Sequence, residues 1–415
     1  MTVASRPIEA DPKLALAKRN ALVLATAQAV VGAVAPVSIA TGGLAGAYML
    51  TDDTLATAPV AGYNVGVALG ALPAAMLMRA IGRRFGLMAG AVVTVTGGLL
   101  AAFALFQNAF WLFVAALLVI GFAAAFSQQY RFAAADHAPH EFRPRAISWV
   151  LAGGLFGAVI GPQMVIQTRA AFDPVLYAGS FLGIAVLGTI GIAILYFLRV
   201  PNRAERTADA ARDEASTPAR PLSRIVRQPA YITALTCSVG GYALMTFVMT
   251  GAPLAMVACG HSTDTAFLGI QWHVMAMFGP SFFTGRLINR FGRDAIIATG
   301  FGLLIACALV AVAGLAVANF WIALILLGVG WNFAFIGATS MVTETYRPSE
   351  KNKAQGFHDL VLFGSVALAS LLSGTTLNAI GWDALNWTIL PVSAVCLCVL
   401  FGLRRFAQQS AVNVS

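Results

Sequence analysis

Repeated apolar runs, each about as long as a membrane helix, decide what this chain can fold into. A membrane-spanning helix needs about 20 mostly apolar residues. Only 10% of the 415 residues are charged and 59% are hydrophobic, whereas an ordinary soluble protein carries about 25% charged residues. Such a chain cannot cover a soluble surface, so we predict an all-α membrane protein with twelve transmembrane helices. The predicted spans are 20–46, 56–78, 86–107, 109–135, 146–168, 176–198, 229–257, 264–288, 295–317, 319–343, 354–379 and 384–403.

Lysine and arginine gather on one side of the expected membrane. The sequence has 26 of these residues. With the N-terminus inside, Arg169 is the only one in an outer turn and Arg131 lies inside the fourth span. The outer turns instead carry aspartates: Asp52, Asp53, Asp173, Asp264 and Asp383. This bias predicts a multi-pass protein of the bacterial cytoplasmic (inner) membrane with both termini cytoplasmic. The net charge of +9 therefore reflects topology, and we expect no nucleic-acid partner.

Motifs typical of enzymes and metal sites do not occur in the sequence. The five cysteines show neither a disulfide framework nor zinc spacing. Neither a metalloprotease H-E-x-x-H nor a G-x-S-x-G nucleophile turn is present, and the phosphate-cradling loop of an ATP-driven pump is missing. We therefore expect no enzymatic activity, no cofactor and no metal.

The chain divides into two similar halves around a polar stretch. Residues 200–228 are rich in charge and proline and indicate a cytoplasmic linker. We predict six-helix bundles at 1–199 and 229–415. Gly82-Arg83 and Tyr63-Asn64 in the first half recur about 210 residues later as Gly292-Arg293 and Trp272-His273. Such repeats are typical of secondary transporters that bind substrate between their halves.

One motif connects the chain to a known family. Between the eighth and ninth spans the sequence reads Gly285-Arg286-Leu287-Ile288-Asn289-Arg290-Phe291-Gly292-Arg293. It resembles the signature G-x-L-x-D-R-x-G-R-R of the major facilitator superfamily, which also occurs between the second and third spans. The copy there departs further, and both copies lack the aspartate, with Arg79 and Asn289 in its place. The resemblance covers essentially the whole chain. It implies two pseudo-symmetric six-helix bundles and transport by alternating access.

In that family the motif loop helps to lock one conformational state. An arginine beside a helix C-terminus meets its partial negative charge and any acid there. We predict cytoplasmic gate contacts between Arg83 and Asp136 and between Arg293 and Glu344, with Arg290 in the same loop. Alternatively, these arginines only set the topology and face lipid phosphates.

Polar side chains inside the spans indicate a central substrate site. The third, sixth, ninth and twelfth spans carry no Asn, Gln, His or charged residue well inside them, which predicts four lipid-facing helices around eight that line a cavity. The predicted lining is amide and aromatic, with one imidazole, and suits a neutral, zwitterionic or planar heteroaromatic solute. For each residue, interhelical hydrogen bonding is the alternative role. The lining comprises Gln28, Asn64, Gln128, Gln163, Tyr242, Trp272, His273, Trp331 and Asn332.

Three titratable residues are candidates for proton coupling. Asp359 is the only acid clearly inside a span, His358 precedes it, and His273 lies nearer the midplane. Carboxylate and imidazole groups in such places can carry a proton. For Asp359 the alternative is a salt bridge to a loop arginine such as Arg83. For His273 the alternatives are a structural role or a substrate contact.

These features predict a proton-coupled secondary transporter of a small organic solute, acting as a monomer in the bilayer. Three other functions stay open. Gly157-Ala158-Val159-Ile160-Gly161-Pro162 resembles the G-x-x-x-G-P element of antiporters, which favours efflux of a drug or metabolite. Segments Gln271–Ser281 and Gly330–Asp359 resemble bacterial facilitators for riboflavin, which favours vitamin uptake. A membrane receptor that does not transport its ligand could use the same fold.

Overall fold

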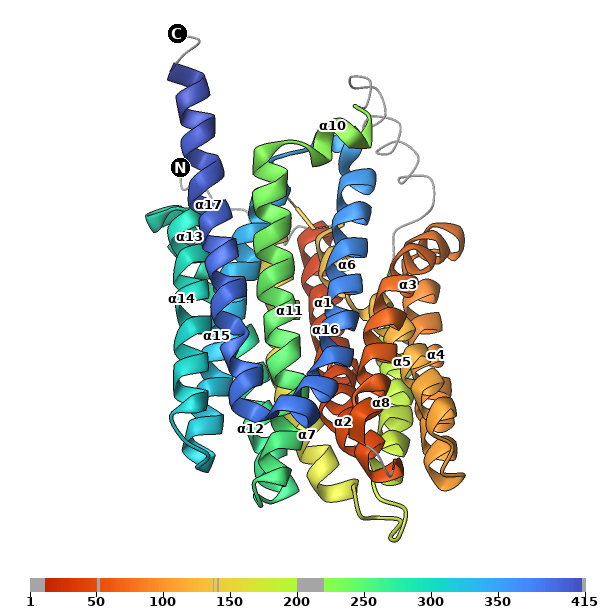
Figure 1. Ribbon diagram of the computed structural model, residues 1–415. Helices are drawn as coiled ribbons and strands as arrows, with labels where there is room; N and C mark the ends of the chain where they lie inside the picture. The colour runs from red at the N-terminus through yellow and green to blue at the C-terminus, as the bar shows by residue number, and fades with distance from the viewer. Residues whose placement is uncertain (1–11, 51–52, 137, 140–141, 200–219, 413–415) are drawn as a thin grey trace, which may run out of the picture.

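The computed structural model describes residues 12–50, 53–136, 138–139, 142–199 and 220–412, which form helices joined by short turns (Figure 1). We call the described residues up to 199 the N-half and those from 220 the C-half. The N-half contains α1 (Pro12–Val31), α2 (Val34–Met49), η1 (Asp53–Leu55), α3 (Ala58–Ile81), α4 (Arg83–Phe106), α5 (Phe110–Ser127), α6 (Tyr130–Asp136), α7 (Arg143–Thr168) and α8 (Ala178–Tyr196). The C-half contains α10 (Leu222–Val226), α11 (Pro229–Ala258), α12 (Thr263–Phe278), α13 (Ser281–Phe291), α14 (Arg293–Val312), α15 (Val317–Val342), η2 (Pro348–Glu350), α16 (Lys351–Trp387) and α17 (Ile389–Val412).

The predicted membrane spans coincide with these helices. Within the described residues, ten helical stretches are long and apolar enough to cross a membrane. The predicted span 264–288 consists of the two shorter helices α12 and α13, and the last span corresponds to α17, whose apolar part is Ile389–Gly402. The chain is therefore an all-α, multi-pass membrane protein, as the hydropathy pattern predicts.

Three predicted spans are broken rather than continuous. The first is divided into α1 and α2 near Gly32, the fourth into α5 and α6, and the eighth into α12 and α13 at Pro280. Proline has no N–H to donate to the carbonyl four residues earlier. Pro36 therefore leaves the carbonyl of Gly32 without its helical donor at the first break, and Pro280 has the same effect at the third.

The internal repeat is visible in the backbone. Gly82 ends α3 with φ 91° and ψ 159°, and Gly292 ends α13 with φ 85° and ψ 154°. A positive φ is accessible to glycine at little cost and strains other residues. In both halves the next helix then begins at an arginine, Arg83 or Arg293. The two motif copies thus make the same turn.

The two ends of the molecule correspond to the basic and acidic sides that the sequence predicts. α10, the start of α1 and the end of α17 lie at one end, at the top of Figure 1, with α6 and α13 nearby. We call this the basic end. The opposite end, which carries the turns around Arg169 and Asp264, is called the acidic end.

Hydrophobic packing differs between these ends. One large buried cluster combines residues of both halves, such as Val37 and Phe113 with Val248 and Phe267. A second cluster near the basic end contains N-half residues, including Leu24 and Tyr130. A third, around Ile225 and Tyr231, belongs to the C-half. The halves therefore share one core toward the acidic end and keep separate cores at the basic end.

The antiporter-like glycines of α7 pack closely against the first span. An added Cβ on Gly157 would lie 3.0 Å from the backbone nitrogen of Ala33, and one on Gly161 would lie 2.8 Å from the Ala33 carbonyl oxygen. Small residues permit such close approach of membrane helices. Helix packing therefore accounts for this motif without reference to the direction of transport.

Candidate functional site

A central cavity lies between the two halves. Its lining residues belong to α1 and α2, which together form the first span, and to α3 to α7, α11, α12 and α16. The polar part of the lining consists of amides and hydroxyls with one charged group: Gln28, Asn64, Thr94, Ser127, Gln128, Arg131 and Thr246. Thr94 belongs to α4, so one of the four helices predicted to face only lipid also reaches the cavity.

An aromatic group forms the C-half wall of this cavity. The Tyr242 ring meets Trp331, Phe335 and Phe363 edge-on, at centroid distances of 5.3, 5.2 and 6.2 Å. Trp331 and Phe335 are stacked at 5.1 Å behind it. Tyr242 and Phe363 themselves line the cavity, and Tyr63 lines it from the N-half. Aromatic surfaces from both halves thus border one space.

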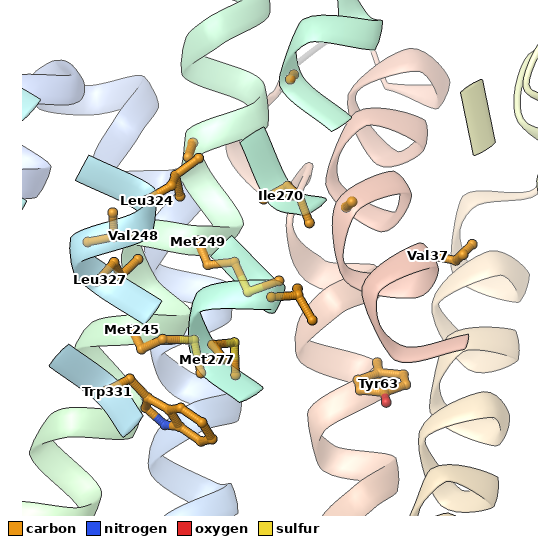
Figure 2. Packing of buried hydrophobic residues seen from close by; sticks show 14 of the residues in the cluster. Val37, Tyr63, Met245, Val248, Met249, Ile270, Met277, Leu324, Leu327 and Trp331 are labelled. Carbon is orange, nitrogen blue, oxygen red and sulfur yellow. The ribbon is translucent and has the colours of Figure 1, made fainter. Parts of the chain in front are cut away.

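Methionine side chains also contribute to the C-half wall of the cavity. Met245, Met249 and Met277 line the cavity, and Figure 2 shows Met277 between Trp331 and Tyr63 in that view. Thioethers adapt their shape and make favourable contacts with aromatic rings. The wall therefore suits a flat, polarisable ring system.

Arg131 is the one charged residue among the described residues that line the cavity. Its side chain is exposed, and its guanidinium lies over the Phe132 ring at 4.8 Å. Asp359 of the opposite half and Tyr242 lie within electrostatic range. We did not predict Arg131 as a site residue, although the sequence places it inside the fourth span. The signal that could have found it is the high cost of an uncompensated cation within a membrane span.

Four of the nine predicted substrate residues line the cavity: Gln28, Asn64, Gln128 and Tyr242. The other five lie elsewhere. Gln163 donates to Gln271 across the halves at 2.9 Å, and Trp272 has an exposed side chain outside the cavity lining. Trp331 lies behind Tyr242.

The last two predicted substrate residues hold helices of the C-half together. His273 is fully buried, and its Nδ1 lies 2.8 Å from the carbonyl oxygen of Leu324. Asn332 donates to the carbonyl oxygen of Met277 and accepts from Thr284 at 2.6 Å. Both residues therefore make the interhelical bonds that were the alternative to substrate binding.

Polar contacts join the halves at the acidic end. Asn64 donates to the Ser370 hydroxyl at 2.7 Å, next to the cavity. Thr57 donates to the carbonyl oxygen of Leu371 and accepts from the Gly374 amide, both at 3.2 Å. These bonds connect η1 and α3 to α16.

A second group of inter-half contacts connects α7 to α12. Besides the bond between Gln163 and Gln271, Arg169 forms an ion pair with Asp264 at 2.9 Å. With the shared core, these two groups close the acidic end.

Two of the three candidate proton-coupling residues, His358 and Asp359, form a short chain with Ser238 in the C-half, whereas His273 lies apart from them. Asp359 Oδ1 lies 3.1 Å from His358 Nδ1, and His358 Nε2 lies 2.8 Å from the Ser238 hydroxyl. His358 is buried, whereas 48% of the Asp359 side chain is exposed. A half-exposed carboxylate thus lies beside a buried imidazole, which can hydrogen-bond to it.

The predicted gate contacts are described in part. Arg293 and Glu344 form an ion pair at 2.5 Å, but both belong to the C-half, so the pair joins α14 to the end of α15. Arg290 lies over the Phe291 ring at 5.2 Å. Arg83 contacts the Met78 sulfur at 3.7 Å, and the side chain of its predicted partner Asp136 lies outside the described residues.

A buried ion pair joins Arg220, at the start of the C-half, to Glu350 of η2. Glu350 is fully buried and binds Arg220 through both carboxylate oxygens at 2.8 and 2.7 Å. It also accepts from the backbone amides of Arg220 and Arg347. The Arg220 side chain and these amides hold the pKa of Glu350 well below its ordinary value, and Glu350 in turn raises the pKa of Arg220. We call this set of contacts the Glu350 clasp.

Metal ligands do not cluster in the part of the chain that the structure describes. No group of three or more His, Cys, Asp or Glu side chains there could hold a metal ion.

Known proteins resemble the chain over almost its whole length. A family model described as Major Facilitator Superfamily matches residues 21–335 and 273–413. The "Riboflavin transporter RfnT" of Brucella anthropi is 48% identical over 384 residues, which cover 92% of this chain and 95% of that protein. The "Uncharacterized MFS-type transporter YdeG" of Bacillus subtilis is 32% identical over 385 residues, covering 91% of this chain and 90% of that protein. "Uncharacterized MFS-type transporter YddS", from the same organism, is 31% identical over 398 residues, covering 93% and 89%.

Proposed function

The chain belongs to the major facilitator superfamily and is a transporter. We propose that it carries riboflavin or a close flavin relative across the bacterial inner membrane. The observation that carries the proposal is the 48% identity to a riboflavin transporter over nearly the whole of both chains. The cavity gives independent support. Riboflavin is a neutral molecule with a flat three-ring system and a chain of hydroxyl groups. Tyr63, Tyr242 and Phe363 offer aromatic faces for the rings, and Gln28 and Gln128 offer amides for the hydroxyl groups.

Uptake of labelled riboflavin tests this function. The chain is expressed in a riboflavin-requiring bacterium that lacks its own carrier, and growth and initial uptake are measured. We expect growth at micromolar riboflavin, with uptake competed by flavins and not by unrelated vitamins. Uptake at the vector-only level, with the protein present in the membrane, would refute riboflavin import. The same assay in everted vesicles would then detect efflux.

Two matched pairs of variants test whether this cavity is the substrate site. Tyr242→Ala removes a ring that lines the cavity, whereas Trp272→Ala removes an exposed ring outside it. The second pair removes one amide each. Gln128→Ala removes an amide that lines the cavity, whereas Gln163→Ala removes an amide that donates to Gln271 across the halves. We expect the cavity member of each pair to raise KM by about 5- to 30-fold, since a lost stacking or hydrogen-bonding partner costs about 1–2 kcal/mol. The other member should change KM less than threefold.

Proton coupling is the second part of the proposal. Asp359, with His358 beside it, would carry the proton, because the Asp359 carboxylate lies within electrostatic range of the cavity residue Arg131. In vesicles with an imposed pH gradient, Asp359→Asn should abolish accumulation above equilibrium while riboflavin exchange continues. Gradient-driven accumulation retained in Asp359→Asn would remove Asp359 from the coupling step and leave it a structural role.

The orientation follows from the charge distribution. We place the basic end in the cytoplasm, by the positive-inside rule. With this placement the shared core and the inter-half bonds lie on the periplasmic side, which supports a cytoplasm-facing state. Cys259, exposed just after α11 at the acidic end, tests this placement. A membrane-impermeant maleimide should label it in whole cells and fail to label Cys259→Ser. Labelling only in everted vesicles would reverse the orientation.

A further inference from the structure

We propose that Arg131 recognises the electronegative edge of the transported ring system and so determines both the specificity and the orientation of the substrate. This inference rests on the proposed transport of a flavin. It assigns the guanidinium to the pyrimidine edge, where the ring nitrogen N1 and the carbonyl oxygen at C2 stand side by side as hydrogen-bond acceptors.

The surroundings of Arg131 leave its donors available. The side chain is exposed and lines the cavity, and it is the one charged group among the described lining residues. Its guanidinium carbon lies over the Phe132 ring, a contact that uses none of its N–H groups as hydrogen-bond donors. Asp359 is within electrostatic range, yet in the described residues no carboxylate lies within ion-pair distance of Arg131.

A cation in this position requires an acceptor. Charged side chains inside membrane spans are costly and persist where they face a cavity and have a function. A guanidinium carries five N–H donors in a planar fork, and it prefers partners that offer two adjacent acceptors. The N1 and C2 carbonyl oxygen of a flavin form such a pair in the ring plane, as do N5 and the C4 carbonyl oxygen, and the assignment is to the first pair.

The aromatic wall places the ring next to this charge. Tyr242 lines the cavity and lies within electrostatic range of Arg131. A flavin stacked on the wall made by Tyr242 and Phe363 can therefore direct its pyrimidine edge toward Arg131. Its hydroxyl chain can then reach the amides of Gln28 and Gln128.

Flavin analogues that differ by one ring atom test this assignment. In 1-deazariboflavin the N1 acceptor is replaced by C–H, and in 5-deazariboflavin the change lies away from the pyrimidine edge. For the wild-type protein we expect 1-deazariboflavin to bind about 10- to 100-fold more weakly than riboflavin, as for loss of a hydrogen bond to a charged group. The 5-deaza compound should bind like riboflavin. Binding is measured on purified protein and uptake in cells.

The variants then connect this discrimination to Arg131. Arg131→Gln should weaken riboflavin binding by a similar factor and bind riboflavin and 1-deazariboflavin equally. Arg131→Lys keeps the charge without the planar fork, and it should retain part of the discrimination. Thermal unfolding of each variant, compared with the wild-type protein, shows that a loss of binding is not a loss of folding.

Three outcomes would overturn the assignment. Undiminished discrimination between the two compounds in Arg131→Gln would exclude contact with the pyrimidine edge. Transport that is lost in Arg131→Asp and in Asp359→Arg but restored when both changes are combined would make Arg131 a gate partner of Asp359 instead. Failure of the wild-type protein to bind or transport any flavin would refute the proposed function itself, and with it this inference.

Discussion

The acidic and basic ends of this transporter are held together by different kinds of interaction. At the acidic end the halves meet through neutral hydrogen bonds, such as that between Asn64 and Ser370, and through the half-exposed pair of Arg169 and Asp264. At the basic end the strongest contact, the Glu350 clasp, lies wholly within the C-half. Neutral hydrogen bonds and exposed ion pairs each contribute about 1 kcal/mol or less. Contacts that must break in each transport cycle are thus individually weak, and the strong contact lies where nothing has to separate.

Locking the acidic end should have the largest effect. A Cβ added to Gly374 would lie 3.2 Å from the Thr57 Cβ, close to the roughly 3.5–4.5 Å spacing of a disulfide. With both residues changed to cysteine and the native cysteines replaced, oxidation should reduce uptake to background, and reductant should restore it. Thr57→Cys and Gly374→Cys alone are the controls. Full uptake by the cross-linked protein would mean that the acidic end does not open during transport.

Wedging the same contact open should have the next largest effect. A side chain at Gly374 would meet the Thr57 hydroxyl at 2.6 Å in the closed arrangement. Overpacking typically costs about 1–3 kcal/mol, so Gly374→Val should shift the equilibrium away from this state by about 5- to 150-fold. Impermeant thiol reagents should then reach a cysteine at Ser370 from the acidic side much faster. Gly364→Val is the matched control, because a Cβ there would meet nothing within 4 Å.

Breaking the Glu350 clasp should affect stability more than transport. Glu350→Gln leaves Arg220 without its counter-charge, and we expect the thermal unfolding temperature to fall by roughly 5 °C at pH 7. Because folding lowers the pKa of Glu350, its stabilisation is complete above the ordinary value of 4.5 and is lost as the pH falls below it. The difference between wild type and variant should therefore be constant from pH 7 to 5 and shrink only in more acid solution. A difference that disappears near neutrality would contradict this assignment.

Neutralising the acidic-end ion pair should have the smallest effect. Arg169 and Asp264 are 28% and 45% exposed, so water and salt screen their attraction. Asp264→Asn should change the initial uptake rate by fivefold or less, and the difference should diminish at high ionic strength. A change of a hundredfold would show that the pair does more than hold the end closed.

The hydropathy pattern and the glycine–arginine repeat predict this fold well. Helices that cross a lipid bilayer must be largely apolar, and turns with a positive φ favour glycine, so the sequence shows both features directly. The breaks near Gly32 and Pro280 are harder to predict, since proline is tolerated in many membrane helices. Among the site residues, depth alone identifies Asn64 and Tyr242 but also selects His273 and Asn332. Depth gives the height of a residue in the membrane and not the face of its helix, and neighbours such as Trp331 and Asn332 point about 100° apart. That angle depends on tertiary packing, as does the exposure of Arg131 to the cavity.

The core shared by both halves has a consequence for how the molecule comes apart. Residues from each half complete one another's hydrophobic packing in a single cluster. Neither half should therefore melt as an independent unit, and unfolding should show a single cooperative transition. By the same logic, an unbroken peptide chain between Arg199 and Arg220 should not be needed to hold the molecule together. Two separately synthesised fragments, cut between residues 200 and 219, should associate in the membrane and transport substrate together.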